Sequence, residues 1–192
     1  MGAASSLHSI YSDATYWFQT YMDKETYMAC YDEMDVNKDG GIDFIEFKSW
    51  ISAKSKKKRD SMWHEAEQCG SAIMMAHKLA CMQFGASSSG VAKRCVDISD
   101  MRALFIHLYA VCIIWKHFTK ANSDDPDLYK KKITQDEFNA DLAVLCEMRS
   151  KEELTPTQLM EDFFTLDNNY VGKIGFVQVC VVFGGPYIVL IS

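Results

Sequence analysis

The sequence predicts an all-α protein of four helix–loop–helix units, arranged as two paired lobes with short β contacts between paired loops. Two observations lead to this fold class. A stretch rich in side-chain oxygens lies between two segments whose apolar residues recur at helical spacing. One β-branched residue also recurs at the same place in each unit: Ile42, Val96, Ile133 and Ile174. A single unit of this size cannot bury its apolar face alone, so we expect two pairs.

The best-defined loop runs from residue 35 to residue 46 and has the pattern of an EF-hand calcium loop. Calcium takes six to eight oxygen ligands, and a glycine is needed at the sharp turn, where Gly40 stands. The alternative, an acidic surface turn, leaves Ile42, Glu46 and the flanking apolar stripes unexplained. The predicted ligands are Asp35, Asn37, Asp39, the carbonyl of Gly41, Asp43 through a water, and both carboxylate oxygens of Glu46.

The second and third loops lack these ligands. Counting back from Val96, the oxygen positions of the second loop are filled by Ser89, Val91 and Lys93, with Asp100 at the last position. The segment before Ile133 is too long for a twelve-residue loop, and residues 130–132 are all lysines. We expect neither loop to hold calcium; the alternative for the third is binding through a loop of non-standard length.

The fourth loop keeps part of the pattern. Gly172 and Ile174 are retained, but Val171 stands where an oxygen is needed, and Gln178 replaces the bidentate carboxylate. An amide offers one neutral oxygen, so we expect at most weak binding at high calcium. The residues of this weak site are Asp167, Asn169, Lys173 and Gln178.

These loops divide the chain into four parts. Residues 1–22 form an N-terminal segment, with a helix starting after Asp13. Residues 23–100 form the first pair of units and residues 101–183 the second. Residues 184–192 form an apolar tail that either folds back into a groove between units or packs permanently on the core.

Helical patterns are also expected between the loops. One runs from Met62 to Phe84, and Thr155-Pro156-Thr157-Gln158 is a clear helix start, with a capping threonine and a proline in the first turn. The longest apolar run, residues 103–115, is too short to span a bilayer.

Two features point to a membrane. Gly2 fits the N-myristoylation pattern, although a small-residue N-terminus is also an ordinary flexible end. A basic cluster follows the first unit, and it is either a patch for anionic lipid or an acidic partner, or a solvated helix end. The cluster consists of Lys54, Lys56, Lys57, Lys58 and Arg59.

Composition limits the remaining functions. A net charge of −6 argues against a general nucleic-acid binder. No secretory signal is recognisable, so the seven scattered cysteines are expected to be reduced thiols of a cytoplasmic protein. His77 and Cys81 could form a metal-binding or nucleophilic pair, but no third group is spaced to join them, and a buried structural thiol is commoner. We expect no enzyme activity.

With four units laid out, the chain resembles the four-EF-hand calcium-binding proteins over most of its length. The resemblance is carried by residues 35–46 and by their echo at residues 167–178. The long apolar helix at 101–118 makes it similar to the flagellar calcium-binding proteins (calflagins) of protists. That resemblance implies N-terminal acylation and calcium-dependent binding to the flagellar membrane. The chain departs from calflagins at Ala3, where they carry a cysteine, and in having its intact loop first.

The leading hypothesis is a calcium sensor or adaptor, in which calcium at the first loop changes an apolar surface read by a target protein helix or a membrane. The alternatives are a cytosolic calcium buffer that changes little on binding and a structural subunit that grips a target helix. Calcium-dependent exposure of apolar surface separates these three.

Overall fold

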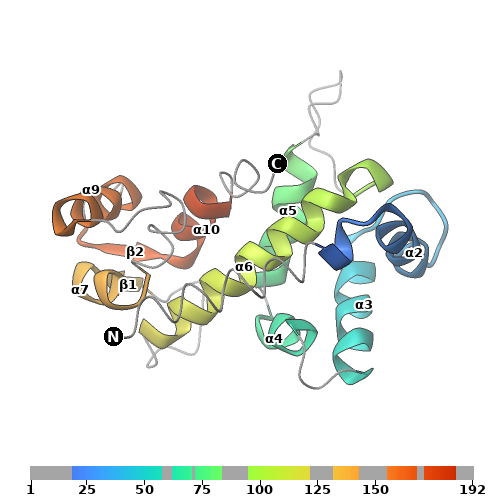
Figure 1. The fold of residues 1–192 in the computed structure, drawn as a ribbon, viewed down its shortest axis with the longest axis horizontal. Coiled ribbons are helices and arrows are strands. Elements are labelled where there is room, and N and C mark those ends of the chain that lie inside the picture. Colours follow the sequence, from blue (N-terminus) through green and yellow to red (C-terminus); the bar gives the residue numbers. More distant parts are fainter. Residues whose placement is uncertain are drawn as a thin grey trace. The chain divides into compact units, whose positions relative to one another are not determined.

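The computed structural model describes residues 19–57, 62–70, 72–83, 95–121, 132–142, 155–167 and 171–184. In these ranges the protein is mostly helical, with one small two-stranded sheet (Figure 1). The chain divides into two compact units. The described part of the N-terminal unit ends at Cys112, and that of the C-terminal unit begins at Ile113. This boundary falls within α6 (Met101–Ala121), whereas the sequence pattern placed it just before that helix.

The N-terminal unit is built from helices that follow one another closely along the chain. The chain is helical at residues 19–21, and Asp23 then caps α2 by accepting a hydrogen bond from Thr26 N at 2.9 Å. The elements of the unit are α2 (Lys24–Met34), α3 (Phe44–Lys57), α4 (Met62–Gln68), α5 (Ala72–Gln83), the 3₁₀ turn η1 (Ile98–Asp100) and the first part of α6.

The helical pattern expected from Met62 to Phe84 is present as two helices, because α4 and α5 are separate. Gly70 adopts a φ of +48°, the left-handed conformation that ends many helices and that glycine adopts without strain. Its N–H donates to Glu67 O at 3.2 Å, closing the last turn of α4. The apolar period continues across the turn, which is why the pattern alone suggested one helix.

Aromatic side chains fill the core of the N-terminal unit. The Trp50 and Trp63 rings meet edge to face, with centroids 4.7 Å apart, and Tyr21 packs on Trp63 and on Phe105. Such pairs stabilise a core beyond the area they bury. They join α3, α4 and α6 to the residues before α2.

The helix α6 is longer than the apolar run in its sequence. The apolar run of residues 103–115 is short by itself, but the segment Ile98–Lys116 that contains it is, by length and composition, able to cross a membrane. In the most apolar 18-residue window of this segment, 67% of the residues are buried inside the protein, so packing already accounts for the apolar composition.

The C-terminal unit contains two short paired strands and several helices. Thr155 and Gln158 form the expected capping box at the start of α9. The Phe138 ring packs against Phe163 at 5.7 Å between centroids. The elements are the last part of α6, β1 (Lys132–Thr134), α7 (Gln135–Glu137), the π-helical turn η2 (Phe138–Leu142), α9 (Pro156–Leu166), β2 (Lys173–Gly175) and α10 (Phe176–Gly184).

The four recurring β-branched residues pair as expected. Ile42 and Val96 form an antiparallel bridge with N···O distances of 2.8 and 2.9 Å, and Ile133 lies opposite Ile174 in the antiparallel β1–β2 pair. All four side chains are fully buried. The residues five positions further on are also fully buried: Phe47, Met101, Phe138 and Val179. This part of the prediction is confirmed, because both the pairing partners and the repeated burial agree with it.

Candidate metal site

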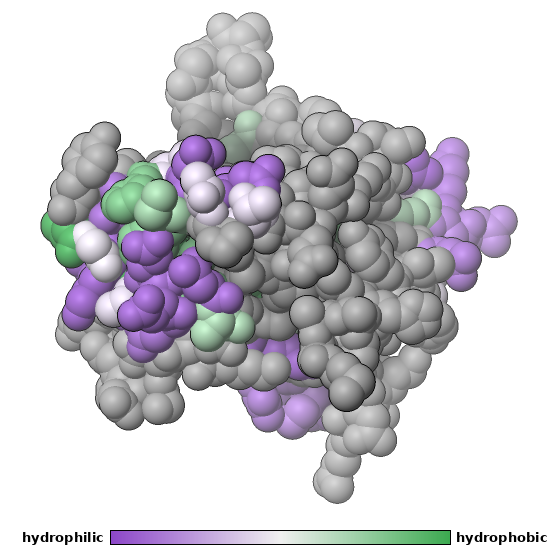
Figure 2. All heavy atoms as spheres, turned by 60° about the vertical axis from the view of Figure 1, so that its left-hand side comes forward, coloured by the Kyte–Doolittle hydropathy of each residue, from purple (hydrophilic) through white to green (hydrophobic). Residues whose placement is uncertain are grey.

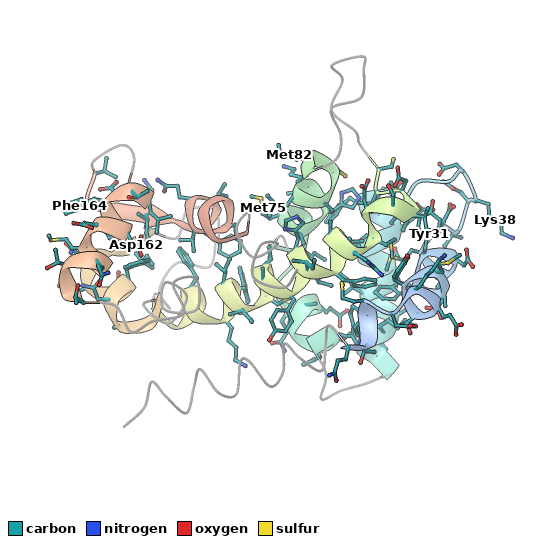
Figure 3. All side chains as sticks on the ribbon, turned by 45° about the horizontal axis from the view of Figure 1, so that its top comes forward. Tyr31, Lys38, Met75, Met82, Asp162 and Phe164 are labelled. Atoms are coloured by element: carbon teal, nitrogen blue, oxygen red, sulfur yellow. The ribbon has the colours of Figure 1, made fainter. Side chains whose placement is uncertain are left out.

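The first loop, between α2 and α3, begins where α2 ends. Asp35 N still donates to Tyr31 O at 2.9 Å, but its ψ of 76° takes the chain out of the helix. Lys38 and Gly40 then adopt φ values of +57° and +83°. No atom lies within 4 Å of a Cβ built at Gly40, so the backbone conformation alone favours glycine there. Lys38 lies at the tip of the loop and points into solvent (Figure 3).

Side-chain oxygens of the first half of the loop accept hydrogen bonds from the loop's own backbone. The two Asp35 oxygens accept from Asp39 N at 3.2 Å and from Gly40 N at 3.1 Å. Asn37 Oδ1 also accepts from Asp39 N, and Asp39 Oδ1 accepts from Gly41 N, at 2.9 and 3.0 Å. The turn therefore wraps around these oxygens rather than splaying them into solvent.

Glu46 closes the loop from the first turn of α3. It forms a reciprocal cap with Asp43: Glu46 N donates to Asp43 Oδ1 at 2.8 Å, and Asp43 N donates to Glu46 Oε2 at 3.0 Å. The other carboxylate oxygen, Oε1, accepts from Val36 N at 3.2 Å and from Asn37 N at 3.4 Å. One side chain thus ties the start of α3 to the opposite side of the loop.

The chemistry of the loop fits a hard cation, although its carboxylates do not converge. Among the described residues, no group of three or more His, Cys, Asp or Glu side chains is arranged to hold a metal ion. The donor set itself suits calcium, because the loop offers four carboxylates, an amide oxygen and a carbonyl within twelve residues, and each carboxylate oxygen has a second lone pair.

The fourth loop repeats the hydrogen bonds of the first. Asp167 is buried, and its oxygens accept from Val171 N at 3.1 Å and from Gly172 N at 2.7 Å, as Asp35 does from Asp39 and Gly40. Gly172 has a φ of +72°. Val171 itself is exposed and supplies no side-chain oxygen.

The closing residue differs between the two loops. Gln178 Oε1 accepts from Gly175 N at 2.7 Å, and Gln178 Nε2 donates to Leu166 O at 2.9 Å. Of the other residues of the expected weak site, Lys173 is exposed on β2, and Asn169 lies outside the described residues. Weak binding at this loop stays a prediction.

The second and third loops keep only their closing halves in the described part of the chain. Asp97 caps η1 through Ser99 N at 2.8 Å, and Asp100 is fully buried. Thr134 and Glu137 form a reciprocal cap at 2.7 and 3.4 Å. The other positions that the sequence compares with metal ligands lie outside the described residues: Ser89, Val91, Lys93, Lys130 and Lys131.

His77 has a role that the sequence did not reveal. Its Nε2 lies 2.9 Å from the carbonyl oxygen of Ile42, at the bridge between the first two loops. Because a carbonyl only accepts, Nε2 carries the proton, and Nδ1 faces Cys81 Sγ at 3.8 Å. Burial lowers the pKa of His77, against the opposing effects of the Ile42 bond and the Asp43 charge. In the sequence, His77 is recognisable only as a histidine on an apolar helix, and this does not indicate which group it contacts.

A second unexpected contact joins α2 to α3. Glu33 Oε2 accepts from Trp50 Nε1 at 2.8 Å and pairs with Lys54 Nζ at 2.6 Å, and Lys54 lies over the Trp50 ring. We refer to Glu33, Trp50 and Lys54 as the helix clamp. One member of the predicted basic cluster is therefore already paired within the unit.

The structure describes only some of the residues that are expected to contact lipid or a partner. Lys56 is exposed. Gly2, the side chain of Lys57, Lys58, Arg59 and residues 185–192 lie outside the described residues. Apolar side chains are exposed on α9 at Met160 and Phe164, and Figure 2 shows hydrophobic and hydrophilic groups side by side on a face of the protein (Figures 2 and 3).

A comparison of the chain with models of protein families and with curated proteins found no match.

Proposed function

We propose that this chain is a four-EF-hand protein that binds one calcium ion at the first loop and acts as a calcium sensor or adaptor. The observation that carries the proposal is the reach of Glu46 from α3 to the N–H groups of Val36 and Asn37. A carboxylate in this place is carried by α3 and contacts the far side of the loop, so a cation bound to it would connect the two. The proposed ligands are Asp35, Asn37, Asp39, the Gly41 carbonyl, Asp43 and Glu46.

The four-unit reading is supported by the repeat in burial and pairing. Ile42 with Val96, and Ile133 with Ile174, join the loops two by two. In each unit, the fourth residue after the β-branched residue stands in the first turn of the following helix. These residues are Glu46, Asp100, Glu137 and Gln178. Of these, only Glu46 closes a loop that also carries the full set of oxygens.

Calcium would supply a double positive charge to a loop that holds four carboxylates. The chain's own residues do the rest. Asp35 keeps the loop turned through its bonds to Asp39 and Gly40, and Glu46 links the loop to α3. Because α3 carries the buried Phe47 and Trp50, any new partner for the Glu46 carboxylate acts on the core of the N-terminal unit.

A calorimetric calcium titration of the full chain in the presence of magnesium tests the site. The Glu46→Gln variant should lose the high-affinity event, because an amide cannot bind bidentately with two charged oxygens. Glu137→Gln is the matched control, since Glu137 only accepts from Thr134 in its cap and an amide oxygen can do the same. Equal titrations of the parent and Glu46→Gln would rule the site out.

The helix clamp favours the alternative of a buffer or structural unit that changes little on binding. Glu33 holds the two helices of the first unit together through Trp50 and Lys54. A hydrophobic dye added during the titration distinguishes the sensor from the buffer or structural unit. A rise in fluorescence with calcium supports the sensor, and constant fluorescence with one bound ion supports the alternative.

For partners, we propose a target helix and a membrane. Met160 and Phe164 offer exposed apolar surface to a helix, while Gly2 and the basic cluster would together hold an anionic membrane, because one myristoyl chain binds only marginally. We therefore propose a cytoplasmic protein that associates with a membrane, which by the resemblance to calflagins is the flagellar membrane. Sedimentation of myristoylated protein with anionic vesicles should fail after Gly2→Ala. The proposal includes no catalytic role, since His77 is engaged by Ile42 O.

A further inference from the structure

The side-chain amide of Gln178 joins the end of α9 to the start of α10. It accepts from Gly175 N and donates to Leu166 O, at 2.7 and 2.9 Å. The orientation of the amide is fixed, because a backbone N–H only donates and a backbone carbonyl only accepts. Leu166 is the last residue of α9, and Gly175 directly precedes α10. Both groups are ones that a helix leaves without a partner inside the helix.

The equivalent side chain of the first loop cannot make this connection. Glu46 accepts from Asp43 N, as Gln178 does from Gly175 N, but its second oxygen faces the N–H groups of Val36 and Asn37. A carboxylate has no proton to offer a carbonyl at neutral pH. The carbonyl equivalent to that of Leu166, on Met34, instead accepts from Val36 N at 2.9 Å.

We propose that Gln178 locks the end of α9 to the start of α10 without a cation, its amide providing the link that a metal-bound carboxylate would otherwise provide. This lock does not depend on calcium binding at the first loop. It makes the packing of α9 against α10 independent of calcium.

The contacts of Asp167 hold the start of this loop as those of Asp35 hold the first loop, so the difference between the two loops lies at Gln178. Both oxygens of Asp167 already accept backbone hydrogen bonds, from Val171 N and Gly172 N. Asp167 is 1% exposed, so its charge relies on these donors rather than on water. The oxygen and the nitrogen of Gln178 are both engaged in the link between α9 and α10, so a cation would recruit this amide only by competing with these two bonds.

Hydrogen exchange of the full chain tests the lock directly. In EDTA, the Gly172 and Gly175 amides of the parent should be protected, and calcium should leave their exchange rates unchanged. A calcium-dependent rate at these two glycines would overturn the proposal. This measurement needs no variant, and its outcome is separate from the calcium titration of the first loop.

Gln178→Glu removes the donor while keeping the shape. At neutral pH the new carboxylate would face the Leu166 carbonyl, so exchange at Gly175 should accelerate by on the order of tenfold, which corresponds to the loss of one hydrogen bond. Gln158→Glu is the matched control. Gln158 stands at the same third position of a helix, but there its oxygen accepts from Thr155 N and Oγ1, which a carboxylate can also do.

Acid should rescue Gln178→Glu, because a protonated carboxyl can donate to Leu166 O. Folding then favours the protonated form and raises the pKa of this group. Its stabilising effect is therefore present below the unfolded-state pKa and lost as the pH rises through the folded-state pKa. Relative to the parent and Gln158→Glu, the variant should regain protection as the pH falls. If Gln178→Glu instead follows Gln158→Glu at every pH, the amide donor is not what holds the loop.

Discussion

The imidazole Nε2 of His77 lies 2.9 Å from the carbonyl oxygen of Ile42, which also accepts from Val96 N at 2.9 Å. One backbone oxygen therefore receives two donors, one from α5 and one from the neighbouring loop. Phe44 and Phe47 flank the imidazole ring, with centroids 5.9 and 6.0 Å away. The helix α5 is thereby tied to the residue that stands between Gly41 and Asp43.

We predict that the calcium-free protein loses stability as the pH falls below the ordinary pKa of histidine. Burial lowers the pKa of His77, so the unfolded chain binds a proton more readily than the folded protein does. The contribution of neutral His77 is full above 6.5 and is lost as the pH falls from there through the folded-state pKa. Urea unfolding in EDTA across this range should show a slope of up to about 1.4 kcal/mol per pH unit.

The groups facing His77 define the control. Asp43 and Cys81 lie next to it, whereas His64 is an exposed histidine on α4. His77→Gln should remove most of the slope just below pH 6.5, while His64→Gln should leave it in place. An unchanged slope in His77→Gln would show that another group carries the pH dependence.

A second prediction concerns the contact between Gly41 and Cys95 across the bridge. A Cβ added at Gly41 would lie 2.9 Å from the Cβ of Cys95, and a Cβ has no freedom to move aside. Gly41→Ala should therefore destabilise the N-terminal unit by about 1–3 kcal/mol in urea unfolding. Cys95→Gly should recover most of this loss in the double variant, because the clashing atom is gone. Additive effects of the two changes would place the strain elsewhere.

The sequence predicted the parts of the fold that depend on spacing. Ile42, Val96, Ile133 and Ile174 were identified because burial and pairing impose the same residue type at the same place in each repeat. The first loop was recognisable because its oxygens and Gly40 must occupy fixed positions.

The sequence could not predict contacts between elements that are far apart in the chain. His77 contacts Ile42, 35 residues away in the sequence, and Trp50 contacts Glu33, 17 residues away. No local sequence pattern predicts either hydrogen bond. The position of Gln178 in its loop indicates a ligand oxygen, and nothing local in the sequence indicates that its N–H₂ group donates to Leu166 O. The break at Gly70 leaves no trace in the apolar spacing, which continues through it.

A third prediction concerns the reactivity of Cys30. Burial raises the pKa of its thiol to about 11, with Lys54 opposing and Glu33 adding to the effect. At pH 8 only about one-thousandth of this thiol is the reactive thiolate. Maleimide labelling followed by peptide mass spectrometry should leave Cys30 unmodified while the half-buried Cys95 reacts, and denaturant should remove the difference. Equal rates in the native protein would contradict the burial of Cys30.

The last prediction tests whether the helix clamp restrains the first unit. If calcium binding separates α2 from α3, the pair between Lys54 and Glu33 opposes binding, and breaking it should tighten calcium binding. The two side chains are 28% and 53% exposed, so the pair is worth about 0.2–1 kcal/mol, or about a 1.4- to fivefold change in Kd. Lys54→Met keeps an aliphatic chain over Trp50 and removes only the ammonium group. Lys48→Met removes the same charge from an exposed position of α3 and measures the purely electrostatic part.

Calorimetry should show tighter binding for Lys54→Met than for Lys48→Met. Equal affinities would mean that α2 and α3 stay together when calcium binds, as a buffer requires.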